Sequence, residues 1–376
     1  MSLKAVREAA VLCAKRAADA EADRRLTPDV LDAVVGCGFA RHFVPARWGG
    51  TAGTFTDLLP AVALLGEGCT SAAWFASLAA GSGRLAAYLP TEGQRALWEH
   101  GPDTVVVGAV TPSGTARTAP GGWRLSGQWP YVSGVDHADW ALVCARVEDA
   151  DDPENRTESR FFAVPRDAWR VVDTWFTTGM RATGSNTLTL DEVFVPQERS
   201  ITVRSLVEGL APDASAACHR VPLQAANGLT LTAALLGGAR GALRRWSQLL
   251  RAKLDAPGTS LSGGPDRSWY ELTLARADGE IDAASLLLRR VAEVADRGRP
   301  DRTLTVRNRR DCALAAQMLA DVVGRLMLAS GSRGQADSEE LQRFWRDVVS
   351  GAGHAALQLP SAAGPFARLT EEASAR

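Results

Sequence analysis

Helical spacing of the apolar positions marks the first part of the chain. Apolar residues recur there at the three- and four-residue intervals of an amphipathic helix. Thr27 and Thr91 are candidate N-caps, and Pro28 suits a first helical turn. We therefore predict a helical domain over residues 1–103. Helices are expected at 26–39, 54–68, 71–89 and 90–100.

Between residues 104 and 200 the pattern changes to short runs rich in β-branched and aromatic residues, separated by turn residues. Six runs at such close spacing predict a central antiparallel sheet or small barrel. The charged segment 148–159 is expected to be a solvent-exposed hairpin loop. The runs lie at 104–110, 122–129, 140–147, 159–165, 169–175 and 186–196.

Helical spacing returns after residue 200 and continues to the end of the chain, which predicts a C-terminal helical bundle over 201–376. A loop rich in Gly, Pro and Ser is expected at 255–268. The three parts together define an α+β fold. The expected helices are 223–253, 278–297, 307–331 and 338–358.

Charge and composition narrow the functional classes. The formal net charge is -1, from 42 Lys and Arg against 43 Asp and Glu with both signs mixed along the chain, which argues against a nucleic-acid partner. No apolar stretch approaches a membrane span or a signal peptide, so we expect a cytoplasmic protein. Six dispersed Cys and five His without ligand spacing predict reduced thiols and no metal site.

Common nucleotide and hydrolase motifs are absent or out of context. The segment 81–86 matches G-x-G-x-x-A, but no strand precedes it, so the tight strand-to-helix turn that binds a pyrophosphate is not expected. Neither a G-x-S-x-G elbow nor a Walker A sequence occurs. These motifs therefore do not support a Rossmann dehydrogenase, an α/β-hydrolase or a P-loop enzyme.

Two polar, glycine-containing segments border predicted strands. Segment 179–196 is either a tight turn that caps its own backbone or a loop beside a ligand, and composition alone leaves these alternatives open. Segment 129–140 reads WPYVSGVDHADW, and by itself it fits a core corner better than a site. His354, in an apolar stretch predicted to be helical, is by itself typical of a hydrogen-bonded core histidine.

Taken in order, the segments resemble the acyl-CoA dehydrogenase fold. The motifs are similar to those of the oxygenase components of two-component flavin monooxygenases, such as 4-hydroxyphenylacetate 3-hydroxylase and related aromatic polyketide and steroid-ring hydroxylases. The resemblance covers about residues 20 to 360. The matching motifs are FVPARWGG, CTSAAW, VTPSGTARTAPGGWRLSGQWPYVSGVDHADW, GMRATGSNTLTLDEVFVP and LQRFWRDVVSGAGHA.

The resemblance implies a particular chemistry. A separate NAD(P)H flavin reductase supplies reduced FMN or FAD, which reacts with O₂ to a C4a-hydroperoxide that oxygenates an aromatic or polycyclic small molecule, or an amine nitrogen. A closed, apolar site protects such a species from water. The resemblance also implies a homotetramer assembled through the C-terminal helices. The richness in Ala, Arg and Gly is consistent with a high-GC bacterial source and a substrate of secondary metabolism, such as antibiotic biosynthesis.

Site residues follow from the matched motifs. Ser133 corresponds to a hydroxyl that bonds flavin N5, and His354 to a histidine that stabilises the hydroperoxide or assists substrate deprotonation. Trp74, Ser82 and His137 are expected in the substrate pocket. The remaining flavin contacts implied by the resemblance are Thr111, Ser113 and Thr115, taken as a loop along the ring, with Trp129, Tyr131, Arg181, Thr183 and Ser185.

Two departures bear on function. Related hydroxylases often carry a His where this chain has Ser82, which argues against a simple phenol and for a larger pocket. Acyl-CoA dehydrogenases use a Glu base, and the corresponding segments around 241–253 and after residue 357 contain no Glu at the expected places. An acyl-CoA dehydrogenase-like FAD oxidoreductase is the weaker alternative, and a redox-silent cyclase or isomerase on the same fold is a third.

Overall fold

The computed structural model describes residues 1–148, 158–212, 216–254 and 267–374. Four of its N-terminal helices match predicted ones, and the first, α1, was not among those predicted. Thr27 occupies the N-cap of α2, although its hydroxyl bonds Asp29 (2.6 Å) instead of the helix backbone. The helices are α1 (Leu3–Asp23), α2 (Pro28–Gly36), α3 (Phe55–Gly66), α4 (Thr70–Ala86) and α5 (Thr91–Trp98).

A seven-stranded sheet follows, in the order β5-β6-β2-β1-β3-β4-β7. All of its pairs are antiparallel except β1 with β3, which run parallel, so the sheet is mixed where a purely antiparallel one was predicted. β3 joins the free side of β1 after the β1–β2 hairpin, a choice of partner that no local pattern encodes. The strands are β1 (Val106–Ala119), β2 (Gly122–Trp129), β3 (Trp140–Glu148), β4 (Ser159–Pro165), β5 (Arg170–Val172), β6 (Thr187–Pro196) and β7 (Ser200–Thr202).

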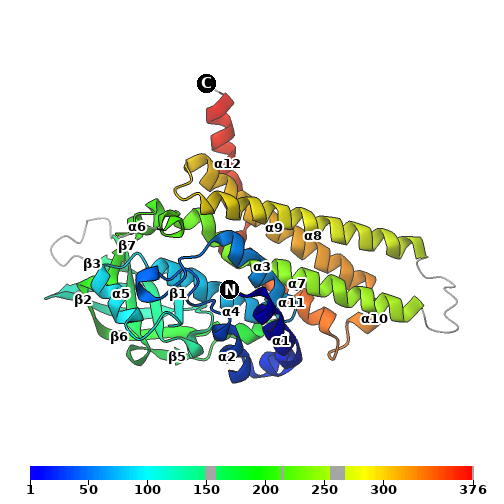
Figure 1. Cartoon of the computed structure of the whole chain (residues 1–376), viewed down its shortest axis with the longest axis horizontal. Coiled ribbons are helices and arrows are strands. Elements are labelled where there is room, and N and C mark those ends of the chain that lie inside the picture. Colours follow the sequence, from blue (N-terminus) through cyan, green and yellow to red (C-terminus); the bar gives the residue numbers. More distant parts are fainter. Residues whose placement is uncertain (149–157, 213–215, 255–266, 375–376) are drawn as a thin grey trace.

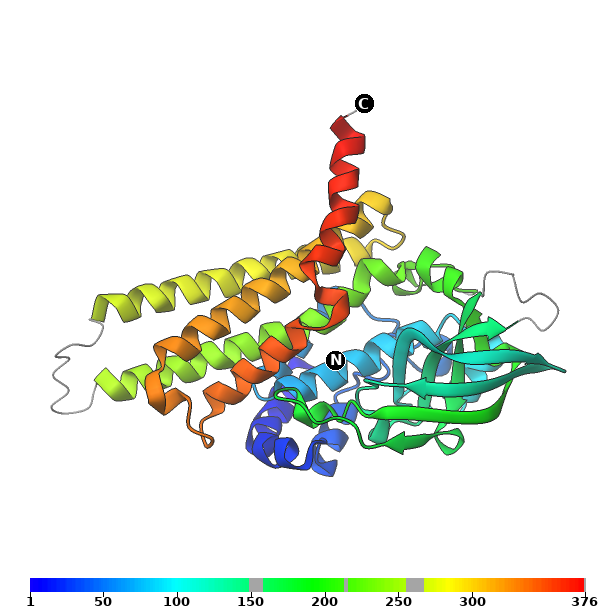
Figure 2. The same cartoon turned by 180° about the vertical axis from the view of Figure 1, so that it is seen from behind.

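Three long helices, α7, α8 and α9, lie side by side at the end of the molecule opposite the sheet, and the terminal α12 projects from the body (Figures 1 and 2). They confirm the predicted C-terminal bundle. α9 is long and apolar enough to cross a membrane, but it packs against α7, α8, α11 and α12. The helices are α6 (Val203–Glu208), α7 (Leu223–Leu254), α8 (Arg267–Asp296), α9 (Arg302–Ala329), α10 (Gly331–Gly334), α11 (Glu340–Ala352) and α12 (Leu359–Ser374).

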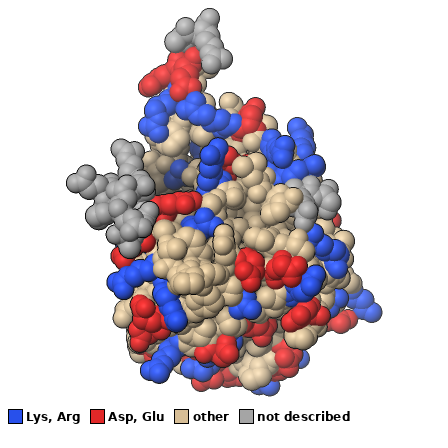
Figure 3. Space-filling model, turned by 90° about the vertical axis from the view of Figure 1, so that its left-hand side faces the viewer, with Lys and Arg blue, Asp and Glu red and all other residues tan. Residues whose placement is uncertain are grey.

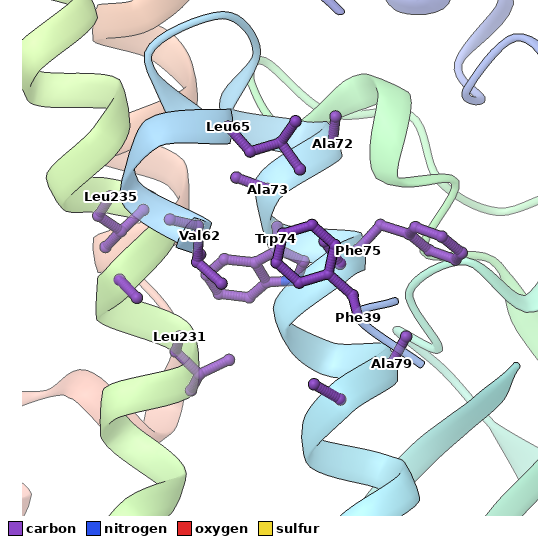
Figure 4. Close-up of a cluster of buried hydrophobic side chains, with 14 of the residues drawn as sticks. Phe39, Val62, Leu65, Ala72, Ala73, Trp74, Phe75, Ala79, Leu231 and Leu235 are labelled. Carbon is purple, nitrogen blue, oxygen red and sulfur yellow. The ribbon is translucent and has the colours of Figure 1, made fainter. Parts of the chain in front are cut away.

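Helix α4 lies at the centre and links the two ends of the molecule. Small residues cover most of its surface, so it is buried nearly all round between α3, α7 and β1. Its Trp74 and Phe75 lie in a cluster with Leu231 of α7 and Val62 of α3 (Figure 4). Because segment 81–86 is inside this helix, the G-x-G-x-x-A match has no nucleotide-binding context.

Further sequence predictions need correction, and two lie partly outside the described residues. Thr91 is the first residue of α5, whose N-cap is Pro90. Helix α11 ends at Ala352, so His354 is not helical; it is the N-cap of the short helix η7 (Ala355–Leu357). Strand β1 continues through Thr111, Ser113 and Thr115, which were predicted to form a loop. Most of the predicted loops 148–159 and 255–268 falls outside the described part of the chain.

The surface carries mixed charge. On the face seen in Figure 3, basic and acidic side chains are interspersed. This arrangement accords with the near-zero net charge of the chain.

Candidate active site

A cavity of about 570 Å³ lies where α4, β1, α7 and the turn after α11 meet the segments that flank β2 and β6. Its size is within the range of small-molecule sites. Ten of the thirteen predicted site residues border it. They are Trp74, Ser82, Thr111, Ser113, Trp129, Tyr131, Ser133, Thr183, Ser185 and His354.

The other three do not line this cavity. Thr115 lies on β1 opposite Ser126 of β2. His137, in η2 (Val135–His137), packs edge-on against Phe75 with ring centroids 6.3 Å apart, and burial lowers its pKa. Arg181 begins η4 (Arg181–Thr183), and its buried Nε has no hydrogen-bond partner among the described residues.

A one-way chain of hydrogen bonds forms one wall. The Thr183 hydroxyl donates its proton to the Met180 carbonyl (2.8 Å), so it accepts from Ser185 (2.7 Å). Ser185 therefore accepts from Ser133 (2.8 Å), and Ser133 accepts from the Trp74 indole N–H (3.1 Å). A hydroxyl has one proton and two lone pairs, so this order is the one that satisfies every member.

This order of hydrogen bonds determines what Ser133 offers to a ligand. Its proton is committed to Ser185 and one lone pair to Trp74, which leaves a single lone pair toward the cavity. Ser133 thus offers its bound partner an acceptor and no donor. A ligand N–H is the group that fits this position.

Aromatic residues frame Ser133 on the β side. Trp129 is fully buried, and its indole donates to the Cys144 carbonyl (2.6 Å). Its ring occupies the space above Gly114, where a Cβ would lie 2.3 Å from a ring carbon. Tyr131 has a left-handed backbone (φ 64°), is 74% exposed and meets Trp175 edge-on, so it lies at the rim.

The stretch of β1 that borders the cavity is irregular. The register of β1 against β3 shifts between Ala109 and Gly114, so the intervening residues leave the regular ladder. Thr111 and Ser113 lie in this stretch, and the Ser113 hydroxyl donates to the Thr111 carbonyl (3.3 Å). A bulge of this kind frees backbone and hydroxyl groups for a ligand.

His354 closes the cavity opposite the sheet. Its Nδ1 accepts the Ala356 backbone N–H (3.1 Å), so the neutral ring carries its proton on Nε2. The ring centroid lies 5.9 Å from that of Trp74. The residue is exposed and borders the cavity, yet surrounding protein atoms desolvate the ring and lower its pKa. In the neutral ring Nε2–H is therefore a hydrogen-bond donor, and Nδ1 is occupied by the Ala356 N–H.

Sequence reasoning missed a polar group of the cavity, Arg84 of α4. Arg84 is 3% exposed and donates to the carbonyls of Cys218 (3.3 Å) and Val221 (2.9 Å). No carboxylate pairs with it in the described part of the chain. Asn227 of α7 borders the same cavity. The available signal was a charged residue in the last turn of a helix otherwise made of apolar and small residues.

Comparisons with known proteins agree with this architecture. The chain is 30% identical over 354 residues to "FADH(2)-dependent resorcinol hydroxylase, oxygenase component" of Rhizobium sp. (strain MTP-10005), covering 90% of this chain and 86% of that one. It is 30% identical to "Flavin-dependent monooxygenase, oxygenase subunit HsaA" of Rhodococcus jostii (strain RHA1), covering 91% of each.

The chain belongs to the flavin-dependent monooxygenase oxygenase family. Solved structures match it over nearly its whole length: a 3-HSA hydroxylase from Rhodococcus sp. RHA1 (TM-score 0.91, 27% identity, 97% of this chain and 95% of that one) and XiaF from Streptomyces sp. in complex with FADH2 and glycerol (TM-score 0.89, 27% identity, 97% and 93%). Residues 229–359 match the family described as "Acyl-CoA dehydrogenase, C-terminal domain". The predicted family and fold class are therefore confirmed.

A flavin-dependent monooxygenase uses reduced flavin and O₂, and the polar groups of the cavity can be compared with those of reduced flavin. Reduced flavin carries a proton on N5, which matches the lone pair that Ser133 leaves free. The bulged stretch at Thr111 and Ser113 provides polar groups beside an otherwise apolar wall. The chain's residues therefore fit the cofactor that the family uses.

Proposed function

We propose that this oxygenase receives reduced FMN or FAD from a separate NAD(P)H flavin reductase and uses O₂ to oxygenate an aromatic or polycyclic small molecule, or an amine, of natural-product type. The observation that carries the proposal is the one-way chain from Trp74 through Ser133 to Met180 on the cavity wall. It leaves Ser133 with a free acceptor, to which an N–H of reduced flavin donates under this proposal. The family to which the chain belongs supports it.

Two residues have the principal roles in the proposal. Ser133 would accept from the N5–H of bound reduced flavin and hold that proton, and the flavin would supply the reaction with O₂. His354 would donate its Nε2–H into the same cavity. Of the two roles expected for His354, hydrogen-bond donation is favoured over substrate deprotonation, because a ring that already carries its proton on Nε2 cannot accept one there.

Support for an aromatic substrate comes from the relatives and from the cavity. Relatives are named for resorcinol, p-hydroxyphenylacetate and indole-3-acetate, all of which are aromatic. The ring of Trp74 borders the space between Ser133 and His354. Arg84 and Asn227 supply polar groups from α4 and α7, so we propose a substrate that also carries an oxygen-bearing acidic group.

The test is stopped-flow absorbance. The purified protein with anaerobically reduced FMN or FAD is mixed with O₂, and the near-ultraviolet band of a C4a-adduct is followed until oxidised flavin appears. We expect a persistent adduct in the wild type and faster decay in Ser133→Ala, by about tenfold for one lost hydrogen bond. Thr115→Ala, which changes a hydroxyl outside the cavity, is the control.

Direct reoxidation of both flavins without an adduct would contradict the proposal. It would favour the acyl-CoA dehydrogenase-like alternative if a CoA thioester reduces bound flavin. It would favour a redox-silent cyclase or isomerase if no flavin binds.

We further propose that the protein acts in the cytoplasm as a homotetramer. All six Cys are free and buried, as in proteins of a reducing compartment. Large apolar side chains remain exposed on α8 and α9, where a neighbouring subunit would cover them.

A further inference from the structure

The hydroxyl chain ends at Met180, whose backbone is unusual. Met180 is 3% exposed and has a left-handed conformation (φ 57°), which is unfavourable for a side chain of its size. Its N–H donates to Oδ1 of Asp347 at 2.6 Å. Asp347 is 5% exposed and belongs to α11, so this contact joins helix α11 to the wall that contains Ser133.

We propose that Asp347 is a positioning residue of the oxygenase site, which acts through Met180 to keep Ser133 an acceptor toward the flavin. The inference rests on the proposed function for the role of Ser133. The structural part of the inference, that Asp347 holds the hydroxyl chain in place, does not depend on bound flavin.

The contacts around Met180 show how Asp347 acts on the hydroxyl chain that ends at Ser133. The Met180 carbonyl accepts both from the Thr183 hydroxyl (2.8 Å) and from the Trp175 indole N–H (2.9 Å). The N–H that Asp347 holds belongs to the Gly179–Met180 peptide, and the carbonyl belongs to the next peptide, so Asp347 acts on the carbonyl through the left-handed backbone angles of Met180. If these angles relaxed, both donors would lose their acceptor. The Thr183 proton would then be free to point back along the chain, and Ser133 would be free to donate.

Helix α11 holds the same segment at a second point. Arg346 donates to the Thr178 carbonyl (2.7 Å) and pairs with Glu21 of α1. A Cβ on Gly179 would lie 2.1 Å from the Arg346 carbonyl oxygen, so only glycine permits this approach. The segment is therefore fixed in place by Arg346, and Asp347 orients the peptide that follows.

Neighbouring groups set the pKa of Asp347 and thereby the strength of its hydrogen bond with the Met180 N–H. Burial, and to a smaller extent the nearby Glu21, raise the pKa of its carboxyl, the Met180 N–H, Arg346 and Arg343 lower it, and the net result is a pKa of about 6. The buried Cys69 also interacts electrostatically with Asp347. An ionised carboxylate is the stronger acceptor for Met180, so the hydroxyl chain is held most firmly at pH values above 6.

The first test needs no flavin. Protein labelled with 5-fluorotryptophan reports on Trp74 and Trp175, whose fluorine NMR signals are assigned with Trp74→Phe and Trp175→Phe. We expect Asp347→Ala to shift both signals and Asp347→Asn to leave both in place, because the Asn carbonyl still accepts from Met180. Unmoved signals in Asp347→Ala would overturn the proposal.

A matched control separates positioning from general loosening. Asp296 of α8 likewise accepts backbone N–H groups, from Phe55 (2.6 Å) and Thr56 (2.9 Å), at the start of α3 and away from the hydroxyl chain. Asp296→Ala is expected to leave the Trp74 and Trp175 signals unchanged. If it shifts them as Asp347→Ala does, the proposal fails.

The second test is the lifetime of the oxygen adduct between about pH 5 and pH 8. We expect decay in the wild type to accelerate as pH falls through about 6, a flat profile in Asp347→Asn, and fast decay throughout in Asp347→Ala. A wild-type profile retained in Asp347→Asn would overturn the role of the charge. Absence of an adduct in every protein would refute the proposed function, whereas the fluorine signals decide the positioning role independently.

Discussion

At the scale of residues, the direction of hydrogen bonds determines more than residue identity. Ser133, Ser185 and Thr183 are three ordinary hydroxyls, yet the Trp74 N–H at one end and the Met180 carbonyl at the other impose one direction on them. The same principle applies to His354, where one backbone N–H selects the tautomer. The hydrogen-bonding roles of Ser133 and His354 are therefore determined by neighbouring groups that take no part in the proposed reaction.

A prediction for His354 follows from that tautomer. His354→Asn retains an N-cap acceptor for the Ala356 N–H but removes the Nε2–H donor. We expect an unchanged melting temperature and a lower yield of oxygenated product per reduced flavin, with hydrogen peroxide in its place. Product and peroxide are quantified in single turnovers. His100→Asn, at a side chain that is 92% exposed, should match the wild type, and an equal loss there would contradict the assignment.

The pH dependence of His354 has a definite sign. Burial lowers its pKa below the ordinary 6.5, so the ring is neutral at pH 7 and above. Protonation at lower pH would place a proton on Nδ1 and break the bond from Ala356. In Asp347→Asn, where the Asp347 contribution is absent, we expect product yield to be flat above pH 6.5 and to fall only below it. A rise in yield on acidification would contradict this prediction.

At the scale of elements, close helix packing positions α4 and with it Trp74. Helices α3 and α7 approach each other through Gly66 and Gly237, where a Cβ on Gly237 would lie 2.2 Å from the Ala63 carbonyl oxygen. α4 then packs against both. The separation of these helices therefore controls the position of the indole that donates to Ser133.

Substitution of Gly237 tests this packing. Gly237→Ala should force α3 and α7 apart and lower the free energy of unfolding by about 1–3 kcal/mol. Gly279→Ala, in an open position on α8, should raise it by about 0.5–1 kcal/mol through helix propensity. Urea unfolding at equal protein concentration measures both. Equal effects at the two glycines would show that packing at Gly237 is not the cause.

At the scale of the whole molecule, the sheet and the long helices lie at opposite ends (Figures 1 and 2), and the cavity is lined by residues from both. Its walls come from segments as far apart as α4 and the turn after α11. The domain limits at residues 103 and 200 stay predictions. The bundle also exposes Leu272 and Leu286 of α8, at 66% and 53%.

Light scattering tests the proposed assembly. We expect a homotetramer at micromolar concentration, and Leu272→Glu with Leu286→Glu should reduce its mass, because charge on a buried apolar contact is costly. Leu210→Glu, at a residue that follows α6 and is 46% exposed, is the control. A clean wild-type monomer would refute the tetramer.

The sequence by itself determined the architecture and the family. Apolar positions at helical spacing predicted α2 to α5 and the long helices α7, α8 and α9, and the β-rich runs predicted six of the seven strands. These predictions hold because local periodicity decides which face of an element is buried. Ordered motifs then identified the oxygenase family, and ten of the thirteen site residues that this family implies border the cavity.

Only the tertiary structure decided how the strands pair, which residues border the cavity and which hydrogen bonds they make. The parallel pairing of β1 with β3, the exclusion of Thr115, Arg181 and His137 from the cavity, and the capping role of His354 all depend on distant partners. The acceptor role of Ser133 depends on Trp74, 59 residues away, and the Met180 peptide depends on Asp347, 167 residues away. Hydrogen-bond direction is a property of a closed network, and such a network exists only when all of its members are in contact.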